Sequence, residues 1–177
     1  MNDPTPRQEG YRAFVKELAA GEFHPQKVTR LMMLAVVESV IEATDGSLDN
    51  IKKDIFYGRS DHDFPEYAAF DPDFTEREWD LFHALMGMIT EAGELAIVLR
   101  DMIQGRSIDE TNLVEELGDV RFYQELAYDA LGTDEEAVVR TNVRKLLKRY
   151  KGGTFSQDEA LNRDTSEEIK AMEESDE

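Results

Sequence analysis

Residues 85–122, LMGMITEAGELAIVLRDMIQGRSIDETNLVEELGDVRF, decide the fold that the sequence predicts. The stretch contains two acidic pairs with the same spacing, Glu91 with Glu94 and Glu116 with Asp119. Residues three apart share one face of an α-helix, so the two carboxylates of each pair are expected to point the same way. Apolar residues around both pairs recur at the helical period, which predicts two amphipathic helices.

A helix end and a helix start lie between the two acidic pairs. Gly105 suits the end of the first helix, and Ser107 with Glu110 has the spacing of a capping box that opens the second. The sequence therefore predicts a helical hairpin whose two arms bring four carboxylates together.

Four neighbouring carboxylates must splay into water, take up protons or bind a cation. At about 5 Å and an effective dielectric constant near 20, each like-charge pair repels by roughly 3 kcal/mol. Clusters made only of carboxylate oxygens suit Mg²⁺ or Mn²⁺. The alternative is a solvated acidic face, because 39 of the 177 residues are acidic and pairs with this spacing also arise by chance.

The composition restricts the kind of partner. The net charge of −19 disfavours nucleic-acid polymers and anionic membranes, which require a cationic surface. A free nucleotide stays possible, because metal ions can bridge its phosphates to carboxylates. The absence of cysteine excludes disulfides and thiolate metal sites and fits a reducing compartment. The first ten residues lack the apolar core of a signal peptide, so we expect a cytoplasmic protein.

The rest of the chain also has helical patterns, and no segment requires a strand. We expect an all-α helical bundle with a single domain over residues 1–164 and a frayed or disordered acidic tail over 165–177. Capping boxes are expected to open further helices at Thr75 with Glu78, at Thr133 with Glu136 and at Ser156 with Glu159. The stretch 58–75 is expected to be a loop whose aromatic residues pin it to the core.

The acidic segments TEAGEL and EELGDV resemble the metal-binding core of the MazG-like, all-α nucleoside triphosphate pyrophosphohydrolases. The resemblance extends over about residues 76–164. Its further parts are Trp79, Phe82–His83 and Met86–Gly87 upstream, and Asn142, Lys145–Leu146, Arg149–Tyr150, Gly153–Ser156 and Asn162–Asp164 downstream. No single motif among these is strong, but their order and spacing together are specific.

The resemblance implies that a nucleoside triphosphate is cleaved between its α and β phosphates, giving a monophosphate and pyrophosphate. Carried over to this chain, Glu91, Glu94, Glu116 and Asp119 would hold Mg²⁺, with Mn²⁺ as a possible substitute. Either Glu94 or Glu115 would accept the proton of the attacking water. Many relatives have a further carboxylate at the position of Thr90, and this departure leaves the identity of the base open.

The substrate contacts implied by the resemblance fall into two groups. Lys145 and Arg149 lie four residues apart and would meet phosphate, while Asn142 and Tyr150 would meet phosphate or sugar. The residues expected to wall the base pocket are Trp79, His83 and Tyr123, for which a place in the apolar core is the alternative.

Two further expectations concern assembly and the competing function. The resembled family forms dimers or tetramers, which implies at least a homodimer here. The alternative to an enzyme is a non-catalytic, acidic helical module that binds a partner or regulates it. Such a module would spread its carboxylates over one exposed surface, whereas a metal-dependent enzyme concentrates them between two helices.

Overall fold

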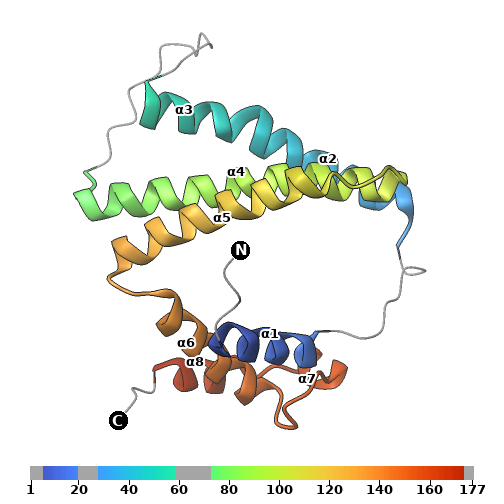
Figure 1. Ribbon diagram of the computed structural model, residues 1–177, viewed down its shortest axis with the longest axis vertical. Helices are drawn as coiled ribbons and strands as arrows, with labels where there is room; N and C mark the ends of the chain where they lie inside the picture. Colours follow the sequence, from blue (N-terminus) through green and yellow to red (C-terminus); the bar gives the residue numbers. More distant parts are fainter. Residues whose placement is uncertain (1–5, 20–27, 59–72, 174–177) are drawn as a thin grey trace. The chain divides into compact units, whose positions relative to one another are not determined.

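The computed structural model describes residues 6–19, 28–58 and 73–173 (Figure 1). All the regular secondary structure of these residues is helical, which confirms the predicted all-α class. The helices belong to two compact units. One spans residues 25–133, and the other combines the N-terminal segment up to residue 24 with residues 134–177.

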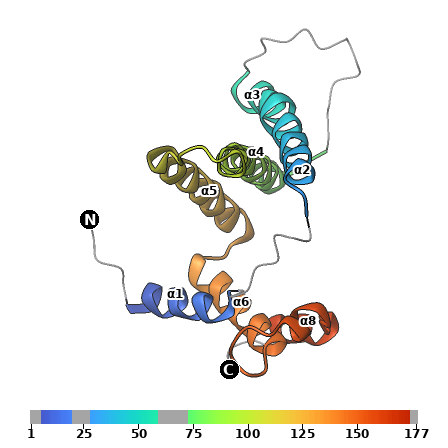
Figure 2. The same ribbon diagram turned by 90° about the vertical axis from the view of Figure 1, so that its right-hand side faces the viewer.

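The larger unit is built around one long helix. α2 (Arg30–Ala43), the short π-helix η2 (Thr44–Leu48) and α3 (Asp49–Tyr57) follow one another without a break. α4 (Glu76–Gln104) and α5 (Glu110–Leu131) form the hairpin. Figures 1 and 2 show α4 between α5 on one side and α2 and α3 on the other. The side chains of α4 that face the neighbouring helices, such as Ala84 and Met86, are therefore buried.

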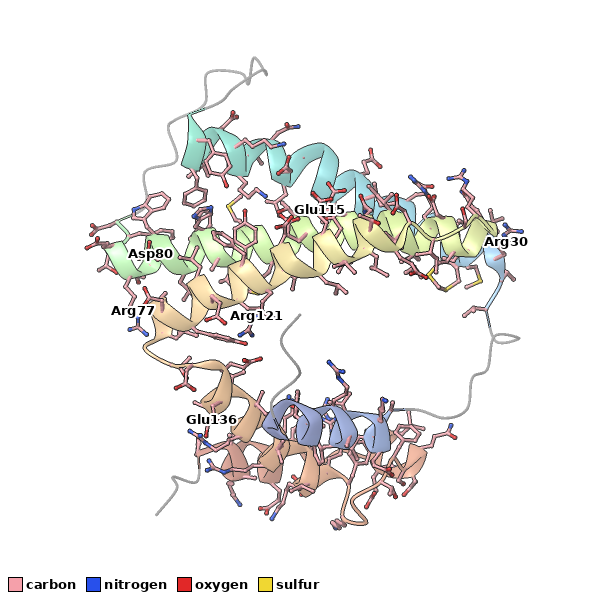
Figure 3. The ribbon with its side chains drawn as sticks, in the orientation of Figure 1. Arg30, Arg77, Asp80, Glu115, Arg121 and Glu136 are labelled. Atoms are coloured by element: carbon pink, nitrogen blue, oxygen red, sulfur yellow. The ribbon has the colours of Figure 1, made fainter. Side chains whose placement is uncertain are left out.

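The ends of α4 follow the sequence prediction. Thr75 and Glu78 form both hydrogen bonds of the predicted capping box, and Gly105 ends the helix with a left-handed backbone (φ 77°). The Arg77 guanidinium donates a hydrogen bond of 2.6 Å to the carbonyl of Ala130, which ties the start of α4 to the end of α5 (Figure 3). The predicted helical hairpin is therefore present, and its open end is closed by a side chain.

Two predicted capping boxes are wrong. The cap of α5 is Asp109 rather than Ser107, and the cap of α6 is Asp134 rather than Thr133. The Asp109 carboxylate accepts hydrogen bonds from the backbone N–H groups of Thr111 and Asn112, at 3.0 and 3.1 Å. In both places an aspartate follows the hydroxyl residue closely, and its negative charge also favours the positive end of the helix dipole.

Helix α4 is long and apolar enough, by length and composition alone, to cross a membrane, and among the described residues it is the one helix that meets this criterion. The central helix of a water-exposed bundle meets the same criterion. Here α4 is flanked by packed helices on two sides (Figure 2).

The smaller unit contains α1 (Pro6–Leu18), α6 (Glu135–Arg149), α7 (Gln157–Leu161) and α8 (Thr165–Glu173). The backbone N–H of Phe155 donates to the carbonyl of Glu17, which joins α1 to the segment after α6. Ser156 caps α7 through the N–H of Glu159, as predicted. Helix α8 packs on α6.

Residues 165–173, expected to be a frayed or disordered tail, are helical in the structure. The reason is Glu168, a buried carboxylate that is only 3% exposed. It accepts two hydrogen bonds of 2.9 Å from the Arg149 guanidinium and two, of 2.7 and 3.2 Å, from that of Arg163. This double ion pair anchors α8 to α6 despite the acidic composition of the tail. Residues 174–177 lie outside the described residues.

Most of the predicted 58–75 loop also lies outside the described residues, which exclude 59–72 and with them the aromatic residues at 64, 67 and 70. Phe74 is described, and its ring contacts Trp79 and Phe82 at centroid distances of 5.3 and 5.7 Å. The stretch 76–164 takes its acidic helices from the larger unit and its closing segment from the smaller one. That residues 1–164 act as a single domain remains a prediction.

Candidate metal centre

Three of the four predicted metal ligands come together between α4 and α5. Glu91 on α4 and Glu116 and Asp119 on α5 each offer a carboxylate oxygen, and these oxygens lie within 4.8 Å of one another. Glu116 is buried, Glu91 is half-buried and Asp119 is exposed. The group, called the carboxylate triad below, therefore extends from the interior of the hairpin to its surface.

The two candidate proton acceptors lie beside the triad. Glu94 is one turn further along α4, is half-buried and is not a member of the triad. Glu115 precedes Glu116 on α5 and is exposed; Figure 3 shows it on the part of α5 that runs alongside α4. The roles of both residues remain predictions.

Glu116, the buried member of the triad, is surrounded by other negative charges. Burial raises the pKa of the Glu116 carboxyl group above its usual value, and the negative charges of Glu91, Glu115 and Asp119 raise it further. A hydrogen bond with Asn112 acts in the opposite direction. A cation bound between these oxygens would relieve both the burial and the mutual repulsion.

A buried lysine from α3 reaches the same point. The ammonium group of Lys52, which is 5% exposed, donates to the Thr90 hydroxyl at 2.7 Å. It also forms ion pairs with Glu91 at 3.4 Å and with Asp49 at 3.2 Å. Three helices, α3, α4 and α5, therefore contribute charged groups to one place.

Tyr123 fills the space next to Lys52 and the triad. Its ring centroid lies 5.4 Å from the Lys52 ammonium nitrogen, and the residue is 7% exposed. Burial, a hydrogen bond with Tyr57 and the nearby carboxylates raise the pKa of the Tyr123 phenol, which is therefore neutral at pH 7. Tyr123 is therefore buried beside the triad, and its role as a wall of the base pocket stays a prediction.

An aromatic pocket lies between the triad and the start of α4. Its lining residues are Ile55, Phe56, Trp79, Asp80 and His83, and its volume is about 360 Å³. The His83 ring stacks on Phe56 at a centroid distance of 4.0 Å and contacts Tyr123 edge-on at 5.7 Å. Figure 3 shows Asp80 near the start of α4.

One polar atom of His83 is buried and unpaired. The Nε2 atom of its ring has no hydrogen-bond partner within the part of the chain that the structure describes. Burial lowers the pKa of the His83 imidazole, the Lys52 charge lowers it further, and Asp80 opposes both. The neutral imidazole therefore predominates at pH 7.

Comparisons with protein-family models, curated proteins and solved structures find no match to this chain. The likeness to the MazG-like enzymes thus remains an interpretation of the residues themselves. The structure adds to it the meeting of Glu91, Glu116 and Asp119, which the spacing alone could not establish.

The predicted phosphate-binding residues all belong to the smaller unit. Asn142, Lys145 and Arg149 are half-buried on α6, and Tyr150 follows its last turn and is 6% exposed. The guanidinium of Arg149 already forms a two-bond pair with Glu168. Contacts of these four residues with a substrate remain predictions.

Lys52, Asp49 and Asp80 were not predicted from the sequence. Lys52 carried a recognisable signal, because it shares one face of its short helix with Ile55 and Phe56. When a lysine lies on the apolar face of a helix, its ammonium group is expected either to reach solvent or to pair with a buried acidic residue.

Proposed function

We propose that the protein is a Mg²⁺-dependent nucleoside triphosphate pyrophosphohydrolase. It cleaves an NTP or dNTP between the α and β phosphates and releases a nucleoside monophosphate and pyrophosphate. The observation that carries the proposal is the carboxylate triad, three acidic oxygens within 4.8 Å of one another on the two arms of the α4–α5 hairpin.

The residues present fit a small, hard divalent cation. All three candidate ligands are carboxylates, which is the donor type that Mg²⁺ and Mn²⁺ prefer. The raised pKa of Glu116 supports the same assignment, because a buried acidic group surrounded by other acids is stabilised by a cation. When bound, the ion would neutralise charge on the phosphate oxygens and acidify a water molecule.

The chain's own residues would handle the proton and the fixed charges. Glu115, exposed beside the triad, or Glu94, half-buried on α4, would accept the proton of the attacking water. Lys52 holds the Glu91 carboxylate through its 3.4 Å contact, so that this ligand is oriented before substrate arrives. The roles of Lys145, Arg149, Asn142 and Tyr150 in binding phosphate or sugar are part of the proposal.

The aromatic pocket lies at a suitable separation from the triad to hold a base. His83 and Glu91 are eight residues apart on α4, which corresponds to about 12 Å along a helix axis. A nucleotide with its base against Trp79 and His83 would place its phosphate chain toward Glu91. Tyr123 forms the wall between the aromatic pocket and the triad, because it contacts His83 and lies beside the Lys52 ammonium group.

The protein is further proposed to be a cytoplasmic homodimer, or a homotetramer. Apolar side chains are exposed on α2 and, on the other side of α4, on α5 (Figure 2), and exposed apolar surface is typical of an interface. The most exposed of them are Leu31, Met32, Val36, Val114, Leu117 and Phe122.

The function is tested with a panel of the common NTPs and dNTPs in the presence of Mg²⁺, with the products identified by chromatography. The proposal expects a monophosphate and pyrophosphate in equal amounts from at least one nucleotide, and no product when Mg²⁺ is chelated. If no nucleotide is cleaved and millimolar Mg²⁺ leaves the melting temperature unchanged, the non-catalytic acidic module becomes the better account. Release of a diphosphate and inorganic phosphate would also contradict the proposal.

A further inference from the structure

The ammonium group of Lys52 has no hydrogen left for a ligand. An ammonium group donates three hydrogen bonds, and three acceptors surround Lys52: the Thr90 hydroxyl at 2.7 Å, an Asp49 carboxylate oxygen at 3.2 Å and a Glu91 carboxylate oxygen at 3.4 Å. The Thr90 hydroxyl in turn donates to the carbonyl of Gly87 at 2.9 Å, so its lone pairs face Lys52. Lys52 therefore acts within the protein rather than on a substrate directly.

The position of this ammonium group is fixed from several sides. Its side chain is 6% exposed, and the face of the Tyr123 ring lies 5.4 Å from the nitrogen. An aromatic face attracts a cation and leaves no water on that side. The charge consequently stays next to Glu91 and has no open path into solvent.

The charge of Lys52 offsets only part of the negative charge of the triad. Asp49 also forms an ion pair with Lys53, so Asp49 has a partner besides Lys52. The three carboxylates of the triad carry three negative charges, and Lys52 offsets one of them through Glu91. Within the triad two negative charges therefore remain, as many as one divalent cation carries, and Glu115 adds a further negative charge beside them.

We propose that Lys52 is a built-in cation of the carboxylate triad, which positions Glu91 and limits the centre to one divalent metal ion per chain. A second ion near Glu91 would lie beside a fixed positive charge in a poorly solvated place, where like charges repel strongly. On the Lys52 side of Glu91 it would also find no further carboxylate from α4, because the residue there is Thr90, a neutral hydroxyl. The inference rests on the proposed metal-dependent function and adds the number of ions and the residue that sets it.

The test measures binding of Mn²⁺ to the full-length protein without nucleotide, by electron paramagnetic resonance of the free ion. The wild-type chain is expected to bind one Mn²⁺. Lys52→Met removes the charge at nearly constant size, and it is expected to bind the first ion about tenfold more tightly, a change of about 1.4 kcal/mol, and to take up a second ion. Lys52→Arg keeps the charge and is expected to bind one ion, as the wild type does.

Lys53→Met is the matched control. Lys53 is the next residue on α3, but its side chain is 46% exposed and its charge is screened by water. The same loss of one positive charge there is expected to leave the stoichiometry at one and the affinity within about twofold. A change that came only from the overall charge of the chain would appear equally in both variants.

A second variant covers the case in which Lys52→Met does not fold. Asp49→Asn removes a negative charge from the other side of Lys52, and the inference expects it to bind Mn²⁺ several-fold more weakly at an unchanged stoichiometry. Opposite changes for Lys52→Met and Asp49→Asn follow from electrostatics and are not expected from general damage to α3. Circular dichroism melting curves establish that each variant is folded before it is titrated.

The results separate this inference from the proposed function. The inference is overturned if the wild type binds two ions per chain, if Lys52→Met binds Mn²⁺ with wild-type affinity and stoichiometry, or if Asp49→Asn binds more tightly than wild type. In each of these cases nucleotide cleavage by the wild type would leave the proposed function standing. Both proposals fail if the wild type neither binds Mn²⁺ nor cleaves any nucleotide.

Discussion

The ring of Tyr123 lies directly against the backbone of Gly87. A Cβ atom built on Gly87 would fall 2.2 Å from two ring carbons of Tyr123, a separation that no real contact allows. The two residues come from the two arms of the hairpin, α4 and α5, and both are buried. The close approach of the helices beside the carboxylate triad therefore depends on a missing side chain.

The first prediction is that replacing Gly87 by alanine lowers stability, although such a change in a helix usually raises it. Replacement of an exposed glycine in a helix by alanine normally stabilises a protein by about 1 kcal/mol. Gly87→Ala is instead expected to destabilise the protein by about 2 kcal/mol or more, because the Tyr123 ring has to move. Urea unfolding followed by circular dichroism measures the change.

Gly118→Ala is the control for this prediction. Gly118 lies on α5, and a Cβ atom there meets nothing within 4 Å. This variant is expected to be as stable as the wild type or more stable. Equal stabilisation by both substitutions would show that the arms are further apart than described.

A second prediction concerns the anchor of α8. The ion pairs from Arg149 and Arg163 lower the pKa of Glu168 to about 2, from an ordinary 4.5. A lowered carboxyl pKa stabilises the folded state above the unfolded-state pKa, and this contribution is lost as the pH falls through the folded-state pKa. Glu168→Gln is expected to lower the free energy of unfolding by about 3 kcal/mol at pH 7, because two guanidinium groups lose a buried partner.

The pH dependence checks the cause of that loss. The difference between the wild type and Glu168→Gln should shrink as the pH is lowered from about 4.5 towards 2, where Glu168 itself becomes protonated. Glu167→Gln, on the more exposed side of the same helix, should change stability by no more than about 0.5 kcal/mol. A difference that stays constant down to pH 2 would assign the effect to packing rather than to charge.

The third prediction separates stability from activity at the triad. The raised pKa of Glu116 means that its charged form destabilises the metal-free protein at neutral pH. This cost shrinks as the pH falls through the folded-state pKa and is gone below the lower, unfolded-state pKa. Glu116→Gln is therefore expected to melt at a higher temperature than the wild type without metal, and to release no pyrophosphate. Added Mg²⁺ should raise the melting temperature of the wild type only.

Asp119→Asn provides the comparison within the triad. Asp119 is exposed, so the loss of its charge should leave the melting temperature of the metal-free protein nearly unchanged while still abolishing turnover. Full activity in both variants would rule out the carboxylate triad as the metal centre.

The fourth prediction is a homo-oligomer. Light scattering at micromolar concentration is expected to give at least twice the chain mass of 20.2 kDa. Phe122→Glu on α5 and Leu31→Glu on α2, at side chains 62% and 78% exposed, each place a charge among exposed apolar residues, and at least one of them is expected to lower the measured mass. A monomeric mass for the wild type would contradict the prediction.

The sequence predicted the hairpin because its signals are local. The period of the apolar residues, the box formed by Thr75 with Glu78 and the stop at Gly105 each depend on a few neighbouring residues. The meeting of Glu91 with Glu116 was not fixed by that period, because it also depends on how the two arms are aligned along each other. The helix starts at Asp109 and Asp134 were missed because a hydroxyl residue and an aspartate compete within two positions.

The parts that the sequence did not predict depend on contacts between distant residues. Lys52 lies 38 positions from Thr90, and no local pattern specifies that pair. The helical state of residues 165–173 likewise depends on Arg149, which lies on another helix 19 positions from Glu168. In both cases composition alone favoured solvent exposure, and a buried ion pair reversed that preference.

The most direct test of the central claim is a crystal structure of the protein with Mn²⁺ and a nucleotide analogue that resists hydrolysis, measured at a wavelength where manganese scatters anomalously. The predicted result is a single anomalous peak per chain, bound by oxygens of Glu91, Glu116 and Asp119 at about 2.1 Å. The triad is contradicted if these carboxylates carry no ion while Mn²⁺ binds elsewhere on the chain.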